Sequence, residues 1–246
     1  MRSLAASIAF LTRIPVPGAG GFGAEDVGKS ARWFPAVGLL LGAVYALMLR
    51  LLSSKFPPHV IAVLIVVAEA LLTGALHMDG LADMADGFGG GRTREDVLRI
   101  MRDHVIGSYG GTALILAIGL KVTAMGALVH GGHAVPYLLL APMLGRWSIL
   151  PLSRFLAYAR ESTAAVNHIG TAELVWASLV AAVAVGVLAA FTTPWHGLVC
   201  WVAVAASSAW FGRFCFRKIG GVTGDTLGAN VQISECVVLL AGLALS

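Results

Sequence analysis

The chain has 246 residues, of which 58% are hydrophobic and only 12% charged, with a net charge of +4. A soluble domain usually carries about 25% charged residues, so this composition excludes disorder and argues against a water-soluble globule. The positive charge is not gathered into a dense basic stripe interleaved with aromatic residues, which argues against nucleic acid as a partner.

The N-terminal segment is apolar after Arg2 but is soon interrupted by Arg13, Pro15 and Pro17. No small-residue cleavage site follows a full apolar core, so a removed signal peptide is not expected. The segment instead predicts an amphipathic helix that lies on the membrane surface.

Long apolar segments dominate the rest of the chain. A crossing helix needs about 20 residues, and seven segments approach this length: 33–52, 58–77, 109–130, 134–153, 172–191, 195–212 and 226–245. The segment 134–153 fits least well, because three prolines and Arg146 interrupt it. We therefore expect one domain over residues 1–246, an all-α polytopic integral membrane helical bundle of about seven transmembrane helices plus a short cytosolic amphipathic helix.

Basic residues separate by side in this arrangement. The stretches 1–32, 78–108, 146–171 and 213–225 carry fourteen Lys and Arg residues, Arg146 among them, whereas the alternate connections carry only Arg50 and Lys55. Because basic loops stay inside, the N-terminus and these stretches are predicted to face the cytoplasm of a prokaryotic cell, and the C-terminus to lie outside.

Three aspartates follow the second apolar segment. Spacings of four and three residues place Asp79, Asp83 and Asp86 within about 60° of one another on a helix. Three such carboxylates repel one another, and a divalent cation relieves this; Mg²⁺ in particular prefers a few carboxylates together with phosphate oxygens. The pattern predicts diphosphate–metal chemistry, although aspartates that only cap turns at Asp-Gly pairs remain an alternative.

A short amphipathic helix is predicted next, with Thr93 as its N-cap and apolar residues continuing as far as Val105. It leads into Arg102, Asp103 and His104. Arg102 could bind a phosphate, Asp103 could add a ligand and His104 could move a proton. A surface pair of Arg102 and Asp103 with little energetic value is an equally simple interpretation.

A second polar loop precedes the last apolar segment, with glycines on both sides of Asp225. Glycines permit close backbone approach, and the following helix N-terminus attracts anions. Asp225 would oppose a bare phosphate, so we expect it to act as a cation ligand or a base; an aspartate that merely caps the helix is the alternative.

Three charges, on Glu69, Lys121 and Glu235, fall within apolar segments at similar depths. Charges inside a membrane are costly, so the three are expected to neutralise one another, with Glu235 in a structural or substrate-supporting role. Gly38 and Gly42 are spaced for close helix packing.

Four motifs in sequence order resemble those of the cobalamin synthase family, the adenosylcobinamide-GDP ribazoletransferases. They are FLTRIPVP at 10–17, HMDGLADMADG at 77–87, IMRDHVIGSYG at 100–110 and GVTGDTLGA at 221–229. The resemblance covers about residues 4–245. His104 departs from it, because a small polar residue is expected there.

The resemblance implies a Mg²⁺-dependent membrane enzyme that joins adenosylcobinamide-GDP to α-ribazole, or to its 5′-phosphate, and releases GMP. The expected partners are these small molecules and the lipid bilayer, and self-association is left open. By position, Asp79, Asp83 and Asp86 match the family's acidic motif, with Asp79 on its essential aspartate. Arg102, Asp103 and Gly107 fall in its central motif, and Asp225 and Glu235 on its C-terminal acidic positions.

The site is expected to divide into catalytic, metal-binding and substrate-binding residues. Asp79, Asp83, Asp86 and Asp225 would bind the metal; Asp79, Asp86 and Asp225 are the catalytic candidates, and either Asp86 or Asp225 would accept the hydroxyl proton. The substrate-binding candidates are Arg13, Arg102, Asp103, Thr223, Asn230 and Glu235.

Two other functions share part of this pattern. A CDP-alcohol-type phosphotransferase uses similar acidic chemistry, but it would want an Ala-Arg pair after Asp-Gly, and Gly80 is followed by Leu81 and Ala82. A secondary transporter could use Glu69, Lys121 and Glu235 as a relay, but it would show inverted halves, which the sequence lacks.

Overall fold

The structure is a computed structural model that describes residues 2–103, 105–160, 165–189 and 193–246. The described chain is helical, with an isolated β-bridge between Tyr158 and Val222. The α-helices are α1 (Arg2–Leu11), α2 (Ala24–Ser30), α3 (Phe34–Leu52), α4 (Pro58–Thr73), α5 (Leu76–Gly90), α6 (Arg94–Ile100), α7 (Ser108–His130), α8 (Ala134–Trp147), α9 (Ile149–Phe155), α10 (Thr171–Ala189), α11 (His196–Ile219) and α12 (Gly224–Leu245). Three short 3₁₀ helices are η1 (Ala19–Gly21), η2 (Ala31–Trp33) and η3 (Ala165–His168).

Most of these helices belong to a membrane bundle. Within the described residues, six helical segments are long and apolar enough to cross a bilayer, and the bent pair α4 and α5 makes a seventh if it counts as one crossing. The expected polytopic helical bundle of about seven crossings is confirmed. The end of the predicted crossing 172–191 lies outside the described residues, since α10 is described only to Ala189.

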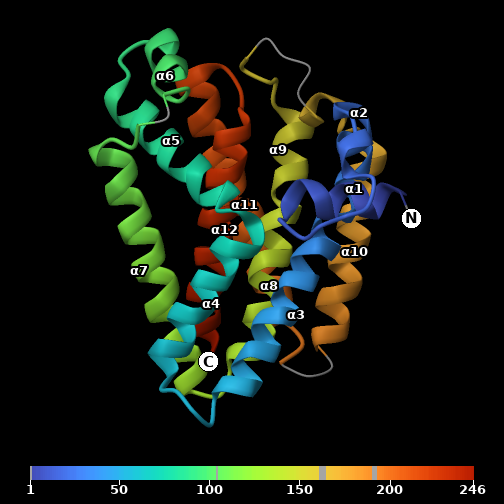
Figure 1. Cartoon of the computed structure of the whole chain (residues 1–246), viewed down its shortest axis with the longest axis vertical. Coiled ribbons are helices and arrows are strands. Elements are labelled where there is room, and N and C mark those ends of the chain that lie inside the picture. The colour runs from blue at the N-terminus through green and yellow to red at the C-terminus, as the bar shows by residue number, and fades with distance from the viewer. Residues whose placement is uncertain (1, 104, 161–164, 190–192) are drawn as a thin grey trace.

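The predicted crossing 58–77 is broken near its end. Gly74 and Ala75 both have positive φ values, 63° and 57°, and α5 runs at 91° to α4. A left-handed Ala costs about 1–2 kcal/mol, so packing must hold this bend. Its effect is to turn α5, the helix that carries the aspartates, away from the direction of α4 and obliquely toward α6, as Figure 1 shows.

The core of the bundle is built around α8 and α12. Helix α12 packs against α5, α7, α8 and α11, and α3 packs along α8; Figure 1 places α12 behind α5 and α4 in the middle of the molecule. The expected close packing at Gly38 and Gly42 is confirmed, because both glycines lie against the backbone of α8.

Replacing Gly38 by Val should therefore destabilise the bundle. Even a Cβ there would lie 2.3 Å from the Pro142 carbonyl oxygen and 2.6 Å from the Met143 Cα, and overpacking costs about 1–3 kcal/mol or more. Thermal unfolding in detergent measures the effect. Gly119→Ala is the matched control: a Cβ at Gly119 meets nothing within 4 Å, so its melting temperature should be unchanged or slightly raised. Equal stability of the two variants would contradict the packing argument.

The polar segments gather at one end of the bundle. Figure 1 shows α6, α2 and the α5 end on one side, and the α3–α4 and α7–α8 connections on the other. Thr93 caps α6 as expected, since its hydroxyl accepts a hydrogen bond from the Asp96 N–H at 3.1 Å. The predicted continuation of this helix to Val105 is wrong: α6 ends at Ile100.

Arg146 does not lie in a polar loop. The interpretation that placed it among the basic loop residues is wrong, because it belongs to α8 and its side chain is fully buried. It compensates charge inside the bundle instead.

Candidate active site

Two of the predicted acidic segments meet at the polar end of the bundle. Asp79 lies in the first turn of α5 and Asp225 in the first turn of α12, and both line one cavity. Gly80 permits this approach, because a Cβ there would lie 2.8 Å from the Asp225 carbonyl oxygen. Residues far apart in the sequence thus share one wall.

The third carboxylate of this group, Asp83, follows Asp79 by one helical turn and is partly exposed. Burial, together with the negative charges of Asp79 and Asp225, raises the pKa of the Asp83 carboxyl to about 6. Asp83 lies on α5, beyond the bend at Gly74. The part of this pKa shift that comes from Asp79 and Asp225 reflects repulsion among the three carboxylates, which a bound cation would relieve.

Arg160 is a site residue that the sequence interpretation missed. Its guanidinium forms an ion pair with the Asp225 carboxylate at 2.8 Å. Backbone pairing holds it there, since the Ala159 N–H donates to the Val222 carbonyl at 2.8 Å and the Val222 N–H to the Ala157 carbonyl at 2.9 Å. In the sequence, Arg160 was only one of many loop arginines, and no spacing linked it to Asp225.

Asp86, the last member of the acidic stripe, faces a different element. Its two carboxylate oxygens accept hydrogen bonds from the backbone N–H groups of Gly107 at 2.7 Å and Gly110 at 2.8 Å. A Cβ at either glycine would collide with the Asp86 side chain. Asp86 thus caps the N-terminus of α7, where a negative charge is favourable. This role explains the glycines of the 100–110 motif, and the sequence had not suggested it.

Asp86→Asn should therefore lower the stability of the protein. An amide oxygen can accept only one of the two N–H bonds, and an unpaired buried N–H costs about 1–3 kcal/mol. Thermal unfolding in detergent measures the effect. Asp83→Asn is the matched comparison: it removes a charge that its acidic neighbours oppose, so its melting temperature should be unchanged or raised. An unchanged melting temperature in Asp86→Asn would contradict the capping role.

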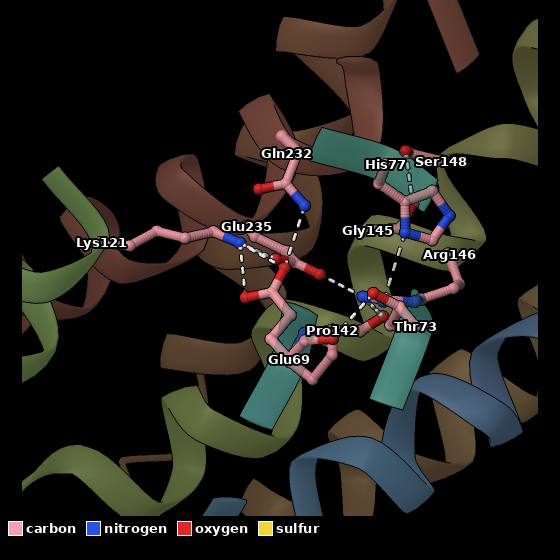
Figure 2. Close-up of polar contacts among 10 residues, drawn as sticks. All are labelled: Glu69, Thr73, His77, Lys121, Pro142, Gly145, Arg146, Ser148, Gln232 and Glu235. Carbon is pink, nitrogen blue, oxygen red and sulfur yellow. Dashed lines mark hydrogen bonds and ion pairs between the residues drawn. The ribbon is translucent and has the colours of Figure 1, made fainter. Parts of the chain in front are cut away.

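The buried charges form one connected cluster (Figure 2). The Lys121 ammonium donates to both Glu69 oxygens, at 2.7 and 2.9 Å, and also pairs with Glu235. Glu235 pairs in turn with Arg146. The expected mutual neutralisation of Glu69, Lys121 and Glu235 is confirmed, and Arg146 is its fourth member, so two positive charges balance two negative ones.

The cluster also defines how Glu235 relates to the acidic site. Both of its oxygens pair with cations, and one of these cations, Arg146, donates to His77 Nδ1 at 3.4 Å in the cavity lining. Glu235 thus lies behind His77 rather than in the cavity.

The other predicted substrate-binding residues are dispersed. Arg13 is exposed and covers the bend at Gly74, and Arg102 is also exposed. The Asp103 carboxylate accepts a turn hydrogen bond from the Val105 N–H at 3.3 Å. Thr223 is buried as the N-cap of α12, and Asn230 is buried between the hydroxyls of Ser148 and Ser208. His104 lies outside the described residues.

The acidic group suits a metal that is only partly bound by protein. Among the described residues, no three His, Cys, Asp or Glu side chains converge closely enough to hold an ion unaided. Asp79, Asp83 and Asp225 nevertheless offer hard oxygen donors that already repel one another, and Mg²⁺ is usually held by one or two carboxylates plus substrate phosphates. The donor set therefore fits Mg²⁺ better than a closed site for a softer metal.

Comparisons with known proteins agree on one family. The family model described as cobalamin-5-phosphate synthase matches residues 3–243. Three similar relatives carry the name adenosylcobinamide-GDP ribazoletransferase. The protein from Ralstonia nicotianae is 39% identical over 99% of this chain and 95% of its own length. The Syntrophobacter fumaroxidans protein is 38% identical over 96% and 95%, and the Sinorhizobium medicae protein 40% identical over 99% and 96%. No solved structure matches the chain.

Proposed function

The chain belongs to the cobalamin-5-phosphate synthase family, and we propose that its acidic site performs the reaction that its relatives are named for, the transfer of adenosylcobinamide phosphate from adenosylcobinamide-GDP to ribazole. The family, the names of its relatives and the apolar helices make this protein a membrane transferase of cobalamin synthesis. The observation that carries the proposal is the meeting of Asp79 and Asp225 at one cavity.

The reaction breaks the phosphoanhydride bond of the donor and forms a phosphoester bond to the acceptor. A hydroxyl of the acceptor attacks the phosphorus on the cobinamide side of the diphosphate, the bond to the bridging oxygen breaks, and GMP leaves. Little covalent work falls to the protein in such transfers, so positioning and charge stabilisation supply most of the acceleration.

The protein groups divide these tasks. Asp225 takes the hydroxyl proton, because both oxygens of the other candidate, Asp86, already accept backbone hydrogen bonds. Arg160, now paired with Asp225 at 2.8 Å, supplies positive charge to the diphosphate. When adenosylcobinamide-GDP binds, its phosphates would attract Arg160, and the Asp225 carboxylate would then be free to accept the proton.

Mg²⁺ would be held by Asp79, Asp83 and Asp225, and when bound it would stabilise the negative charge that develops on the phosphate oxygens. Asp86 and Glu235 then serve the site indirectly, by holding α7 and the buried cluster. Arg13, Arg102, Asp103, Thr223 and Asn230 remain predictions as substrate contacts.

The proposal is tested by turnover. Membranes that contain the protein, incubated with a corrinoid-GDP, α-ribazole and Mg²⁺, should release GMP and form a complete corrinoid in equal amounts. EDTA should stop both, and restored Mg²⁺ should bring both back. GMP release that does not depend on the acceptor, or no product with wild-type membranes, would contradict the transferase assignment.

We further propose that the site faces the cytoplasm across a prokaryotic inner membrane, because the basic residues gather at its end of the bundle. The three native cysteines are buried, so a thiol reagent should label the introduced cysteine and not the native ones. Ser54→Cys should react with an impermeant maleimide added outside cells, and Glu95→Cys only after lysis. The opposite labelling pattern would reverse the orientation.

A further inference from the structure

The cavity beside the acidic site is mostly apolar. It lies between α1, α2, α3, α5, α9 and α12 and has an accessible volume of about 160 Å³. Its apolar wall includes Phe10, Leu11, Phe34, Ile149, Ile169 and Leu227, and Asp79 and Asp225 lie in its lining. The Phe10 and Phe34 rings stack with centroids 5.9 Å apart. The cavity thus suits a ligand with an apolar flat body and a polar end.

His77 is the other polar side chain in this lining. Arg146 donates to its Nδ1 at 3.4 Å. A guanidinium has only donors, so Nδ1 must carry the lone pair and Nε2 the hydrogen. Figure 2 shows Nδ1 turned toward Arg146 and the other ring nitrogen on the far side of the ring. The His77 ring therefore offers a fixed N–H donor away from the cluster.

The buried cluster keeps this donor in place. Arg146 is held by Glu235, Glu235 by Lys121, and Lys121 by Glu69, and the Gln232 amide donates to Glu69 at 2.9 Å. Because this chain of ion pairs fixes Arg146, the side of the His77 ring that carries Nδ1 is fixed toward the cluster and Nε2 points away from it.

We propose that this cavity binds the acceptor nucleoside and that His77 is a positioning residue that donates its Nε2–H to the acceptor. The inference rests on the proposed function, and it assigns the acceptor rather than the corrinoid donor for two reasons. A corrin macrocycle with an adenosyl group is too large for a cavity with about 160 Å³ of accessible space. Guanine would leave its hydrogen-bonding groups unpaired against the apolar wall, which is costly, whereas the substituted benzimidazole of ribazole has few such groups.

Two substitutions at His77 separate its two hydrogen bonds. In His77→Asn, the amide oxygen can replace Nδ1 as the acceptor for Arg146, but the side chain is too short to donate into the cavity. In His77→Gln, the amide nitrogen reaches about as far as Nε2 and keeps that donor. We expect His77→Asn to lower kcat/KM for α-ribazole by about 10- to 100-fold while KM for the corrinoid-GDP stays unchanged, and His77→Gln to restore most of the loss.

The pH profile gives an independent readout. Because His77 is assigned as a hydrogen-bond donor and not as an acid or base, His77→Gln should leave the pH dependence of kcat/KM as it is in the wild type. Loss of an ionisation from that profile would overturn the assignment and make His77 an acid or base. A raised KM for the corrinoid-GDP, or full activity of His77→Asn, would also overturn it.

A second variant covers the case in which His77 substitutions fail to fold. Phe10 is 43% exposed, so Phe10→Ala should fold, and it should raise KM for α-ribazole alone. Phe155→Ala is the matched control, an aromatic residue 73% exposed that does not line this cavity; it should leave both KM values unchanged. If wild-type protein releases no GMP, the proposed function itself fails; if wild type turns over and Phe10→Ala binds acceptor normally, only this inference fails.

Discussion

Asp79→Ala and Asp83→Ala should each lower the rate of GMP release by at least about 10²–10³-fold, the range seen when one group that stabilises transition-state charge is removed. Neither side chain is needed for packing at this end: Asp79 is exposed and Asp83 is partly exposed. Removing Asp83 also removes a carboxyl whose pKa is raised to about 6 by burial and by its acidic neighbours. Stability should therefore stay the same or rise, while activity is lost. Turnover per inserted protein, measured with the corrinoid-GDP assay, tests this.

Glu95→Gln is the matched control for these variants. Glu95 is an acidic residue at the same polar end, in the first turn of α6, with a side chain 78% exposed. It should turn over like wild type. Near-normal GMP release in Asp79→Ala or Asp83→Ala would remove both from the metal site, and loss of activity in Glu95→Gln would point to general charge rather than to specific ligands.

Lys121→Met should lower the stability of the protein more than either Gly38→Val or Asp86→Asn. It leaves Glu69 without its cationic partner, and Glu235 with Arg146 only, inside a helix bundle that spans the membrane. Breaking a buried ion pair from one side costs about 3–5 kcal/mol. We expect a strongly lowered melting temperature in detergent and little accumulation in membranes.

A second substitution should recover much of this loss. In Glu69→Gln/Lys121→Met, the remaining Glu235 and Arg146 pair is neutral and intact, so the double variant should be more stable than Lys121→Met alone. Melting temperatures of the two single variants and the double variant complete the cycle. Additive losses would mean that Glu69 and Lys121 do not act as a pair.

Much of the bundle follows from hydropathy. Apolar length predicts the crossings because backbone groups in lipid must be satisfied within helices. The cost of charge in a membrane correctly predicts the pairing of Glu69, Lys121 and Glu235. The burial of Arg146 was not predicted, because the prolines around it and its place near the end of an apolar segment suggested a loop. In the structure its ion pair with Glu235 allows the charged side chain to be buried.

The features missed at the site depend on backbone geometry. Two consecutive left-handed residues, Gly74 and Ala75, turn α5 aside, and an Ala in that conformation has no sequence signal. Helical spacing groups Asp86 with Asp79 and Asp83, but it cannot tell that the N-terminus of α7 lies beside Asp86. Arg160 is positioned beside Asp225 by two backbone hydrogen bonds between loops that are distant in the sequence, and no local sequence pattern predicts such a pairing.

The position of α12 has a consequence for biogenesis. This last helix brings both Asp225 and Glu235, so a nascent chain that has inserted everything up to α11 holds Glu69, Lys121 and Arg146 with one positive charge in excess. The acidic site is likewise incomplete at that stage. Insertion of α12 therefore neutralises the charge inside the bundle and completes the acidic site in a single step. A ribosome-bound chain that ends before residue 224 should remain bound to the insertion machinery instead of folding.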